Sequence, residues 1–530
     1  MTYTKYLTLT KKEQFKYKFK DSLDRFGHGF INFFVGIGCG FINLFKRIGR
    51  SFKELGYAFK HGDIWTRISF IFLGVSQIRR GQIFKGICFL LIEFIFIFYI
   101  VITGGLALYN IGTLGNTSIH YYCSIDQQTV AAGFSNIVFT DQSTALTYCS
   151  TFGGEASGIC TQYGDNSSLF MLFGVLSILI SVAFIAFYSS VIRKSIKLQE
   201  MKEANLYING AFDDFKELLD NKFYITLLIL PIIGICTFTI LPLIDMVLMA
   251  FTNYNSAHQY PTEMFSWIGL SNFVSLFGGN GSSLFSYTFF NVLAWTLVWA
   301  FFATFLNYFL GMILAMVINK KGIKLKKIWR TFFVLSIAMP QFVSLMTWNK
   351  FLSVSGMVEL FMKELGWMES TAHITILQEA TSARVAIILI NIWIGVPYTI
   401  LTTTGILMNI PADLYESAQI DGASSVTQYF KITLPYILFV TGPYLITQFV
   451  GNINNFNVIY FLTNGAPYVQ DYMRAGKTDL LVTWLYRLTV DDQNYSYASV
   501  IGIMIFVICA FFSLIAYRNS SAMKNEENFA

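Results

Sequence analysis

Charged residues are scarce in this sequence. Only 13% of its 530 residues are Asp, Glu, Lys or Arg, whereas soluble domains carry about 25%. Hydrophobic residues make up 54% of the chain. They fall in runs of about 20 or more, the length needed to cross a hydrocarbon core of about 30 Å. This combination excludes an ordinary soluble domain and predicts an integral membrane protein.

The apolar runs predict an all-α, polytopic membrane helix bundle. Each run must form a helix, because a lone strand would leave its backbone N–H and C=O groups unpaired in lipid. Eight spans are predicted, at 84–107, 169–192, 223–251, 287–318, 330–352, 384–408, 436–461 and 498–517.

Lys and Arg are missing from two long segments between the predicted spans. Neither 103–168 nor 252–286 contains either residue, whereas 193–222 and 319–330 contain six basic residues each. Cytoplasmic loops of membrane proteins are enriched in Lys and Arg. The asymmetry therefore predicts that the N-terminus is cytoplasmic, and eight crossings return the C-terminus to the same side.

One pair of loops does not follow this rule. The loop 409–434, predicted to be cytoplasmic, carries only Lys431, whereas the outer loop 463–497 carries three basic residues. Reversing these helices would contradict the stronger asymmetry earlier in the chain, so the orientation is kept. The first 26 residues are polar and Lys-rich without an apolar h-region, so no cleavable signal peptide is predicted.

Composition divides the chain into five parts. They are a basic cytoplasmic or interfacial region (1–82), two helices with an outer loop at 103–168 (83–192), a cytoplasmic linker (193–222), a functional core (223–519) and a cytoplasmic tail (520–530). The apolar stretch 28–45 is interpreted as an amphipathic segment on the inner membrane face, because a ninth span would place the basic stretch 46–82 outside. A loosely ordered tail is the alternative.

Three of the seven cysteines, Cys123, Cys149 and Cys160, lie in the outer loop. A disulfide can persist outside the cell, and a Cys149–Cys160 bond would close a short loop. Connectivity does not follow from sequence, so free thiols remain the alternative. The other four cysteines lie in apolar stretches and are interpreted as packing residues.

The segment 410–435 predicts two short helices joined by a sharp turn. Pro411 suits the first helical position. Gly422 suits the position after a helix end, where a positive φ is common. Ser425 and Gln428 predict a capping box for the second helix. A cytoplasmic helix–turn–helix joined to two spans is well placed to transmit force, and an ordinary connector is the alternative.

This segment resembles the EAA loop of binding-protein-dependent ABC importers. That loop reads Glu-Ala-Ala, three residues, Gly, nine residues and Ile-x-Leu-Pro, and Ser replaces the middle Ala here. The resemblance implies that the first helix docks in a cleft of a cytoplasmic ATPase, where the Glu pairs with a basic residue. The ATPase-coupling residues that it implies are Glu416, Ser417, Ala418, Asp421, Gly422, Ile432, Leu434 and Pro435.

The resemblance extends over about 220–520 and implies a six-helix ABC importer permease core. The segments Asn391–Tyr398, Gly451–Asn457, Leu462–Pro467 and Thr478–Tyr486 are similar to maltodextrin and galactooligosaccharide permeases of Gram-positive bacteria. Some maltose-type relatives carry an aromatic ring where Gly451 stands, which implies a difference in sugar stacking.

Two polar stripes on the sixth and seventh spans are the candidate sugar site. Their residues follow i, i+3, i+4, i+7 spacing, which places each set on one helix face. Amides and a phenol offer neutral donors and acceptors for sugar hydroxyls. Interhelical packing through Asn and Gln is the alternative. The substrate-binding residues that the resemblance implies are Asn391, Ile394, Gly395, Tyr398, Gln448, Gly451, Asn452 and Asn455.

The function implied by the resemblance is that of an oligosaccharide permease subunit, multi-pass in the bacterial plasma membrane and surrounded by its lipid. Implied partners are a second permease in a heterodimer, a cytoplasmic ABC ATPase dimer and an extracellular sugar-binding protein or lipoprotein. ATP would be used by the ATPase. The chain itself is expected to have no catalytic residue and to bind no cofactor, metal or nucleic acid.

Two other functions fit the sequence less well. An ion-driven secondary transporter would use buried carboxylates, for which Glu93 and Asp245 are the candidates inside spans. A membrane glycosyltransferase would need an acidic metal-binding pair, for which Asp213–Asp214 is a poor candidate. Ala475–Thr478 resembles the end of a P-loop, but the position of its first Gly holds Asp471.

Overall fold

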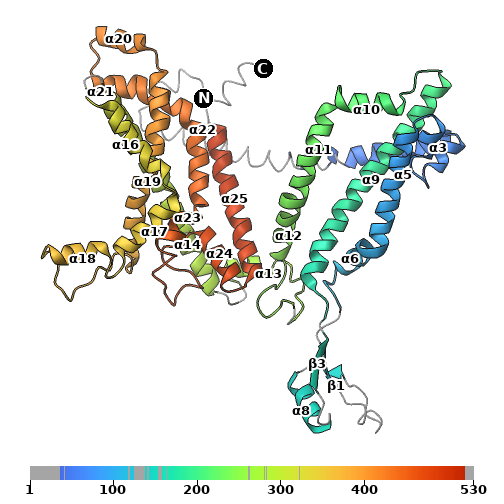
Figure 1. The fold of residues 1–530 in the computed structure, drawn as a ribbon, viewed down its shortest axis with the longest axis horizontal. Coiled ribbons are helices and arrows are strands. Elements are labelled where there is room, and N and C mark those ends of the chain that lie inside the picture. The colour runs from blue at the N-terminus through green and yellow to red at the C-terminus, as the bar shows by residue number, and fades with distance from the viewer. Residues whose placement is uncertain are drawn as a thin grey trace, which may run out of the picture. The chain divides into compact units, whose positions relative to one another are not determined.

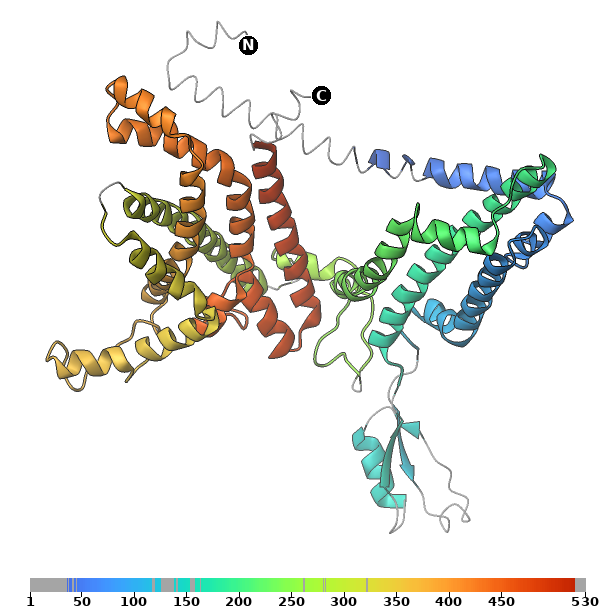
Figure 2. The ribbon, with the colours of Figure 1, turned by 45° about the horizontal axis from the view of Figure 1, so that its top comes forward.

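The computed structural model describes most of the chain between residues 36 and 519. Within that range it leaves out 37, 41, 44, 117–119, 125–137, 140–141, 153–157, 163, 261–262, 280, 282 and 321–322. The chain forms two compact units, Met1–Asp245 and Met246–Ala530, and each is described by itself (Figures 1 and 2).

Helices long and apolar enough to cross a membrane number seven among the described residues. They are Ile83–Asn110, Ser167–Glu203, Phe223–Met249, Leu284–Asn319, Ala380–Met408, Ser425–Ile453 and Tyr495–Ala516. A bent pair, Lys326–Ala338 and Gln341–Leu352, makes an eighth if it is counted as one span. The predicted helical membrane bundle is confirmed.

The first unit is built on two long helices. The elements are α3 (Ile64–Ile68), α4 (Val75–Arg79), α5 (Ile83–Tyr99), the π-helical turn η1 (Ile100–Gly104), α6 (Gly105–Asn110), α9 (Ser167–Glu203), α10 (Ala211–Leu219), α11 (Phe223–Ile235) and η2 (Cys236–Ile240). Helix α12 (Leu241–Met249) contains the boundary after Asp245. Phe96 of α5 stacks on Phe184 of α9 with ring centroids 3.8 Å apart. Residues 45–61 are helical, whereas most of the predicted interfacial segment 28–45 lies outside the described residues.

A buried polar network closes one end of this helix pair. The Arg80 guanidinium lies 2.7 Å from the Asp63 carboxylate and donates to the Thr66 hydroxyl at 2.9 Å. The Gln77 amide donates to the Ser195 hydroxyl of α9 at 2.9 Å. Buried polar groups are costly unless they are hydrogen-bonded, so this network fixes α3 and α4 against α9.

The loop between α6 and α9 contains a small sheet that the sequence did not predict. Strands β1 (His120–Ser124), β2 (Val138–Phe139) and β3 (Gly158–Gln162) are antiparallel in the order β2-β1-β3, beside helix α8 (Gln142–Phe152). Cys123 and Cys160 lie on β1 and β3, and Cys149 lies on α8. Their side chains are outside the described part of the chain, so the Cys149–Cys160 disulfide stays a prediction.

The second unit is a packed helix bundle. Its elements are α13 (Ser271–Leu276), α14 (Ser283–Phe301), η3 (Phe302–Leu306), α15 (Asn307–Asn319), α16 (Lys326–Ala338), α17 (Gln341–Leu352), α18 (Met357–Glu364), α19 (Ala380–Met408), α20 (Ala412–Ile420), α21 (Ser425–Gln428), η4 (Tyr429–Thr433), α22 (Leu434–Ile453), α23 (Phe456–Leu462), α24 (Leu481–Val490) and α25 (Tyr495–Asn519). Helices α20 and α21 lie at one end of this unit, and α18 and α24 lie at the other (Figures 1 and 2).

Close packing of α15 on α19 depends on Gly311. A Cβ at this position would lie 2.5 Å from the Thr399 Cβ and 3.1 Å from the Val396 carbonyl oxygen. Both distances are shorter than van der Waals contact. The missing side chain therefore allows the two backbones to approach, as small residues commonly do between membrane helices.

Two predicted spans are wrong in detail. The fifth, 330–352, is broken, because α16 and α17 meet at an angle of 88° around Met339 and Pro340. Proline disfavours helical backbone in the residue before it, and Met339 is extended with ψ 129°. The seventh, 436–461, ends at Ile453, and Asn455 caps the separate helix α23 by accepting from the Val458 N–H at 3.3 Å.

Candidate functional site

The turn between α20 and α21 has the geometry predicted for Gly422. Its φ is +75°, so the prediction of a positive φ is confirmed. The Gly422 N–H donates to the Gln419 carbonyl at 3.0 Å, and the Ala423 N–H donates to the Ala418 carbonyl at 2.8 Å. This pair of bonds is a Schellman motif, which ends α20 sharply.

The caps of the two short helices differ from the prediction. Ser424, not Ser425, caps α21, and its hydroxyl accepts from the Thr427 N–H at 3.2 Å. The predicted capping box of Ser425 with Gln428 is therefore wrong. Gln428 instead donates to the Ala423 carbonyl at 3.1 Å. Both contacts still fix α21 against the turn that precedes it.

A hydrogen bond ties α20 to the start of α22. The Tyr415 and Thr433 hydroxyl groups lie 2.8 Å apart, and Thr433 is buried. Thr433 ends the π-helical turn η4, and α22 follows it with Pro435 in its first turn. The sequence did not point to Tyr415, because a hydroxyl 18 residues away in the chain leaves no local pattern.

The part of the chain that the structure describes buries no residue of α20 or α21. Glu416, Ser417 and Asp421 are exposed, and Ala418 is half-buried. Ile420 is 87% exposed and stands beside these polar groups. An exposed helix that carries both a carboxylate and a large apolar side chain is suited to docking in a partner's cleft.

The α19 stripe of the candidate sugar site is mixed in exposure. Asn391 is buried, Ile394 and Gly395 are half-buried, and Tyr398 is 49% exposed. Gly395 packs against the Asn307 side chain of α15 so tightly that a Cβ would overlap its amide. Ile394 packs against the buried cluster around Ile390. Among these four residues, Tyr398 is therefore the one that stands on an open face.

The α22 stripe divides in the same way. Gln448 and Gly451 are exposed, and no atom lies within 4 Å of a Cβ built on Gly451. The Asn452 side chain donates to the Thr304 hydroxyl at 2.9 Å, which favours interhelical packing for this residue. Asn455 lies beyond the end of α22, but its amide still donates to the Asn452 side-chain oxygen at 3.3 Å.

Comparison with known proteins identifies the fold that carries these features. Residues 307–525 match the family described as binding-protein-dependent transport system inner membrane component. The chain is 32% identical over 464 residues to the maltodextrin transport system permease protein MdxF of Bacillus subtilis, which covers 86% of this chain and 95% of the relative. The chain belongs to this family of inner membrane components.

Two further relatives agree with this assignment. The permease is 32% identical to the galactooligosaccharides transport system permease protein GanP of Bacillus subtilis, over 68% of this chain and 85% of the relative. It is 33% identical to the maltodextrin transport system permease protein MalC of Streptococcus pneumoniae, over 69% of this chain and 85% of the relative.

Metal-binding side chains do not gather in the described part of the permease. No group of three or more His, Cys, Asp or Glu residues there is placed to hold a metal ion. Glu359 of α18 shows how one buried acid is satisfied instead. It lies 2.7 Å from the Lys363 ammonium and accepts from the Ile374 and Ser355 N–H groups, both at 3.0 Å.

Proposed function

We propose that this permease is the transmembrane subunit of an ATP-driven importer of neutral oligosaccharides. One observation carries the proposal: the coupling segment (α20, α21 and η4, residues 412–433) runs directly into α22 and is tied to its start by the Tyr415–Thr433 hydrogen bond, and α22 carries Gln448 and Gly451 on its open face. A movement of α20 at one end of this path is thus transmitted to the polar face at the other.

Coupling would begin at the uncovered surface of α20. A cytoplasmic ABC ATPase dimer that closes on ATP would pull on this helix, with Glu416 paired to a basic residue of the ATPase. The Schellman turn at Gly422 and the Tyr415–Thr433 hydrogen bond resist bending of the segment. The displacement therefore reaches α22, while ATP hydrolysis stays with the partner.

The second permease subunit would complete the sugar cavity. Among the described residues, none covers Tyr398, Gln448 or Gly451, which are all exposed. Exposed amide and phenol groups at membrane depth are costly unless they face a cavity or another subunit. A heterodimer would enclose them between two six-helix cores. Both termini would be cytoplasmic. An extracellular binding protein would deliver the sugar on the opposite side of the membrane.

The substrate class follows from the chemistry of these groups and from the relatives. The relatives are named for transport of maltodextrin and galactooligosaccharides. Tyr398 and Gln448 offer uncharged donors and acceptors, which suit sugar hydroxyls. Neutral oligosaccharides of one of these two types are therefore the proposed substrates.

Uptake assays test this function. Cells deleted for this chain would receive the wild type, Gly422→Asp or the control Gly442→Ala, and uptake of labelled maltotriose, maltotetraose and galactobiose would be measured. We expect uptake of one sugar type with the wild type and the control, but not with Gly422→Asp. Uptake with Gly422→Asp equal to wild type would contradict the coupling role, and no uptake with the wild type would contradict the substrate class.

A further inference from the structure

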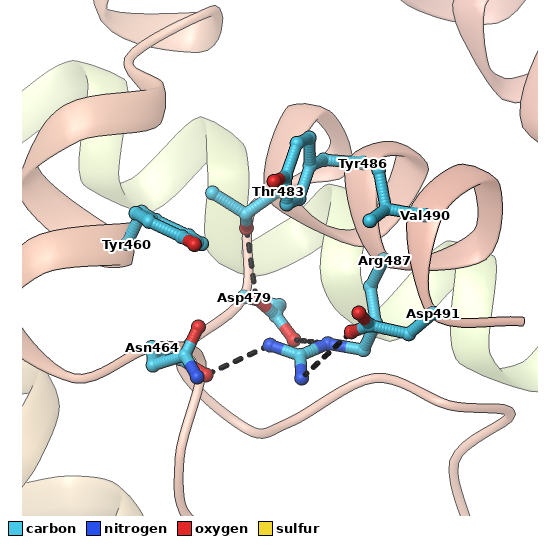
Figure 3. A pocket seen from close by; sticks show the side chains of 8 residues that line it. All are labelled: Tyr460, Asn464, Asp479, Thr483, Tyr486, Arg487, Val490 and Asp491. Atoms are coloured by element: carbon cyan, nitrogen blue, oxygen red, sulfur yellow. Dashed lines mark hydrogen bonds and ion pairs between the residues drawn. The ribbon is translucent and has the colours of Figure 1, made fainter.

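Helix α24 lies at the end of the second unit opposite the coupling segment (Figure 1), and its residues line a small cavity (Figure 3). Its volume is about 250 Å³. It is lined by residues of α23, of α24, of the loop between them and of the C-cap of α24, including Tyr460, Asn464, Asp479, Tyr486, Arg487 and Asp491. Figure 3 shows Tyr460 and Asn464 on one side of this space and Asp491 on the other.

A second cavity adjoins the first. Its volume is about 430 Å³, and its wall includes Arg487 and Asp491 as well as Tyr468 and Tyr472. Together the two cavities reach the size of typical small-molecule sites, about 300 to 1,000 Å³. Because they share Arg487 and Asp491, one elongated ligand can contact both. None of these residues belongs to the stripes on α19 and α22.

The wall of the cavities is held rigid by a buried acid. Asp479 is fully buried and accepts from the Gly476 N–H at 2.7 Å and from the Thr483 hydroxyl at 2.8 Å. Burial raises the pKa of this carboxyl, although the Arg487 guanidinium opposes that shift. Arg487 also donates to the Asn464 carbonyl at 2.8 Å. A site built in advance of its ligand loses less entropy on binding.

Arg487 keeps hydrogen-bonding capacity for a ligand. Its Nε is buried and lies 3.5 Å from Asp479, yet it has no hydrogen-bond partner among the described residues. Its Nη1 is 3.9 Å from Asp491, which is beyond hydrogen-bonding distance. The buried Nε faces Asp479, so the Nη1 donors are the ones left for the hydroxyl oxygens of a ligand.

The aromatic residues and the charge balance indicate the ligand class. Tyr460 and Tyr486 meet edge to face with ring centroids 5.5 Å apart, and each presents an apolar ring with a polar tip. Arg474 lies 3.1 Å from Asp492, and Arg487 is flanked by Asp479. With each arginine paired to a carboxylate, the site has little net attraction for an anion. Rings and hydroxyl-binding groups together fit a neutral, polyhydroxylated ligand.

We propose that the paired cavities form an outer oligosaccharide site, which holds one end of a neutral sugar at the extracellular face before the sugar enters the membrane. This inference rests on the proposed function, which supplies the orientation and the sugar class. It adds a second binding position, separate from the polar face of α22. A sugar released by the binding protein would then be retained at the mouth of the transporter.

Protection of a cysteine from labelling tests this site directly. Val490 lines the first cavity and is 52% exposed, so Val490→Cys should react with a membrane-impermeant maleimide. The assembled transporter in nanodiscs, without binding protein, would be labelled with and without maltotetraose or galactobiose. Modification at residue 490 would be quantified by mass spectrometry. Leu270→Cys, 63% exposed and outside both cavities, is the matched control.

We expect saturable protection of residue 490 by one of the two sugars and none of residue 270. Tyr486→Ala should raise the half-protecting concentration about threefold to tenfold, as expected for a lost aromatic contact, whereas Tyr486→Phe should retain most of the protection. Gln448→Ala on α22 should leave protection unchanged. A wild-type transporter that imports either sugar in cells, yet shows no protection at residue 490, would overturn the outer site and leave the proposed function standing.

Discussion

Tyr415 of the coupling helix α20 and Thr433 at the end of η4 meet hydroxyl to hydroxyl at 2.8 Å, directly before α22 begins. This contact joins two ends of a segment that otherwise turns back through the Schellman motif at Gly422. The coupling segment is therefore closed into a rigid loop rather than left as a free hairpin. Rigidity of this kind is what a force-transmitting element requires.

Removing this contact should uncouple transport from ATP hydrolysis. Tyr415→Phe deletes a hydrogen bond worth about 1 kcal/mol and keeps the ring. We expect fewer sugar molecules imported per ATP hydrolysed by proteoliposomes that contain the assembled transporter. Thr433→Val removes the other partner, and the double variant should be no worse than either single one. Additive losses would show that the two hydroxyl groups act independently.

A side chain at residue 422 should strain the turn. Gly422 has φ +75° in open space, so Gly422→Ala meets no neighbour but adopts a left-handed backbone that costs about 1 to 2 kcal/mol. We expect a lower ATPase rate under stimulation by the binding protein. Gly442→Ala, in the helical interior of α22 with no atom within 4 Å, is the control and should keep the wild-type rate. Equal rates for both variants would count against the strain.

A side chain at residue 311 should separate α15 from α19. Gly311→Ala places a methyl group 2.5 Å from the Thr399 Cβ, and overpacking of this kind costs about 1 to 3 kcal/mol. The melting temperature of the purified permease in detergent should fall. Gly405→Ala on α19, where no atom lies within 4 Å, should leave it unchanged or raise it. An unchanged melting temperature for Gly311→Ala would mean that the helices move apart freely.

Acid should loosen the segment 353–379. The Lys363 ammonium, followed by the Ile374 and Ser355 N–H groups, holds the pKa of Glu359 below its ordinary value. Because this pKa is lower in the folded chain, its stabilising effect is complete above the unfolded pKa of about 4.3 and is lost as the pH falls below it. We expect faster proteolysis of this segment in acid.

Glu359→Gln provides the comparison for that measurement. The amide cannot carry the charge that Lys363 stabilises, so the segment should be cleaved faster at neutral pH, with a weaker dependence on acid. A variant as resistant as wild type at neutral pH, with the same response to acid, would show that Glu359 does not control this segment.

An aromatic ring at residue 451 should change the sugar preference. No atom lies within 4 Å of a Cβ built on Gly451, and Gly451→Phe adds a ring to the exposed face that carries Gln448. A ring stacked on a sugar is expected to lower the KM for maltotetraose by about twofold to tenfold. The ratio of KM values for maltotetraose and galactobiose measures the change. An unchanged ratio would place this face outside the sugar path.

Most of the membrane helices could be predicted because the length of each apolar segment is enough to identify a membrane-spanning helix. Two breaks were missed for a local reason: apolar residues continue on both sides of Pro340 and of Asn454. The break after Ile453 depends on Asn455, whose side chain caps α23. The same asparagine would also fit within a polar stripe on a continuous helix. Hydropathy therefore gives the extent of an apolar segment and not its internal turns.

The coupling turn was predictable and the outer cavities were not. Gly422 lies within a single local pattern, so its positive φ follows from the residues beside it. Arg487 and Asn464 are 23 residues apart, and their contact depends on how the intervening loop folds back. The polar stripes on α19 and α22 could be predicted only in part. Helical spacing placed Tyr398 and Gln448 on surfaces, but it could not show that Gly395 is covered by Asn307.

The bend at Met339 and Pro340 affects how this chain is made. Helices α16 and α17 have 13 and 12 residues, so at about 1.5 Å per residue each is shorter than the hydrocarbon core of about 30 Å. Neither half can leave the translocon as an independent membrane segment. We expect both helices to be retained there until α19 has been synthesised and α16 can pack against it. Membrane insertion of the core should therefore pause at this bent pair of helices.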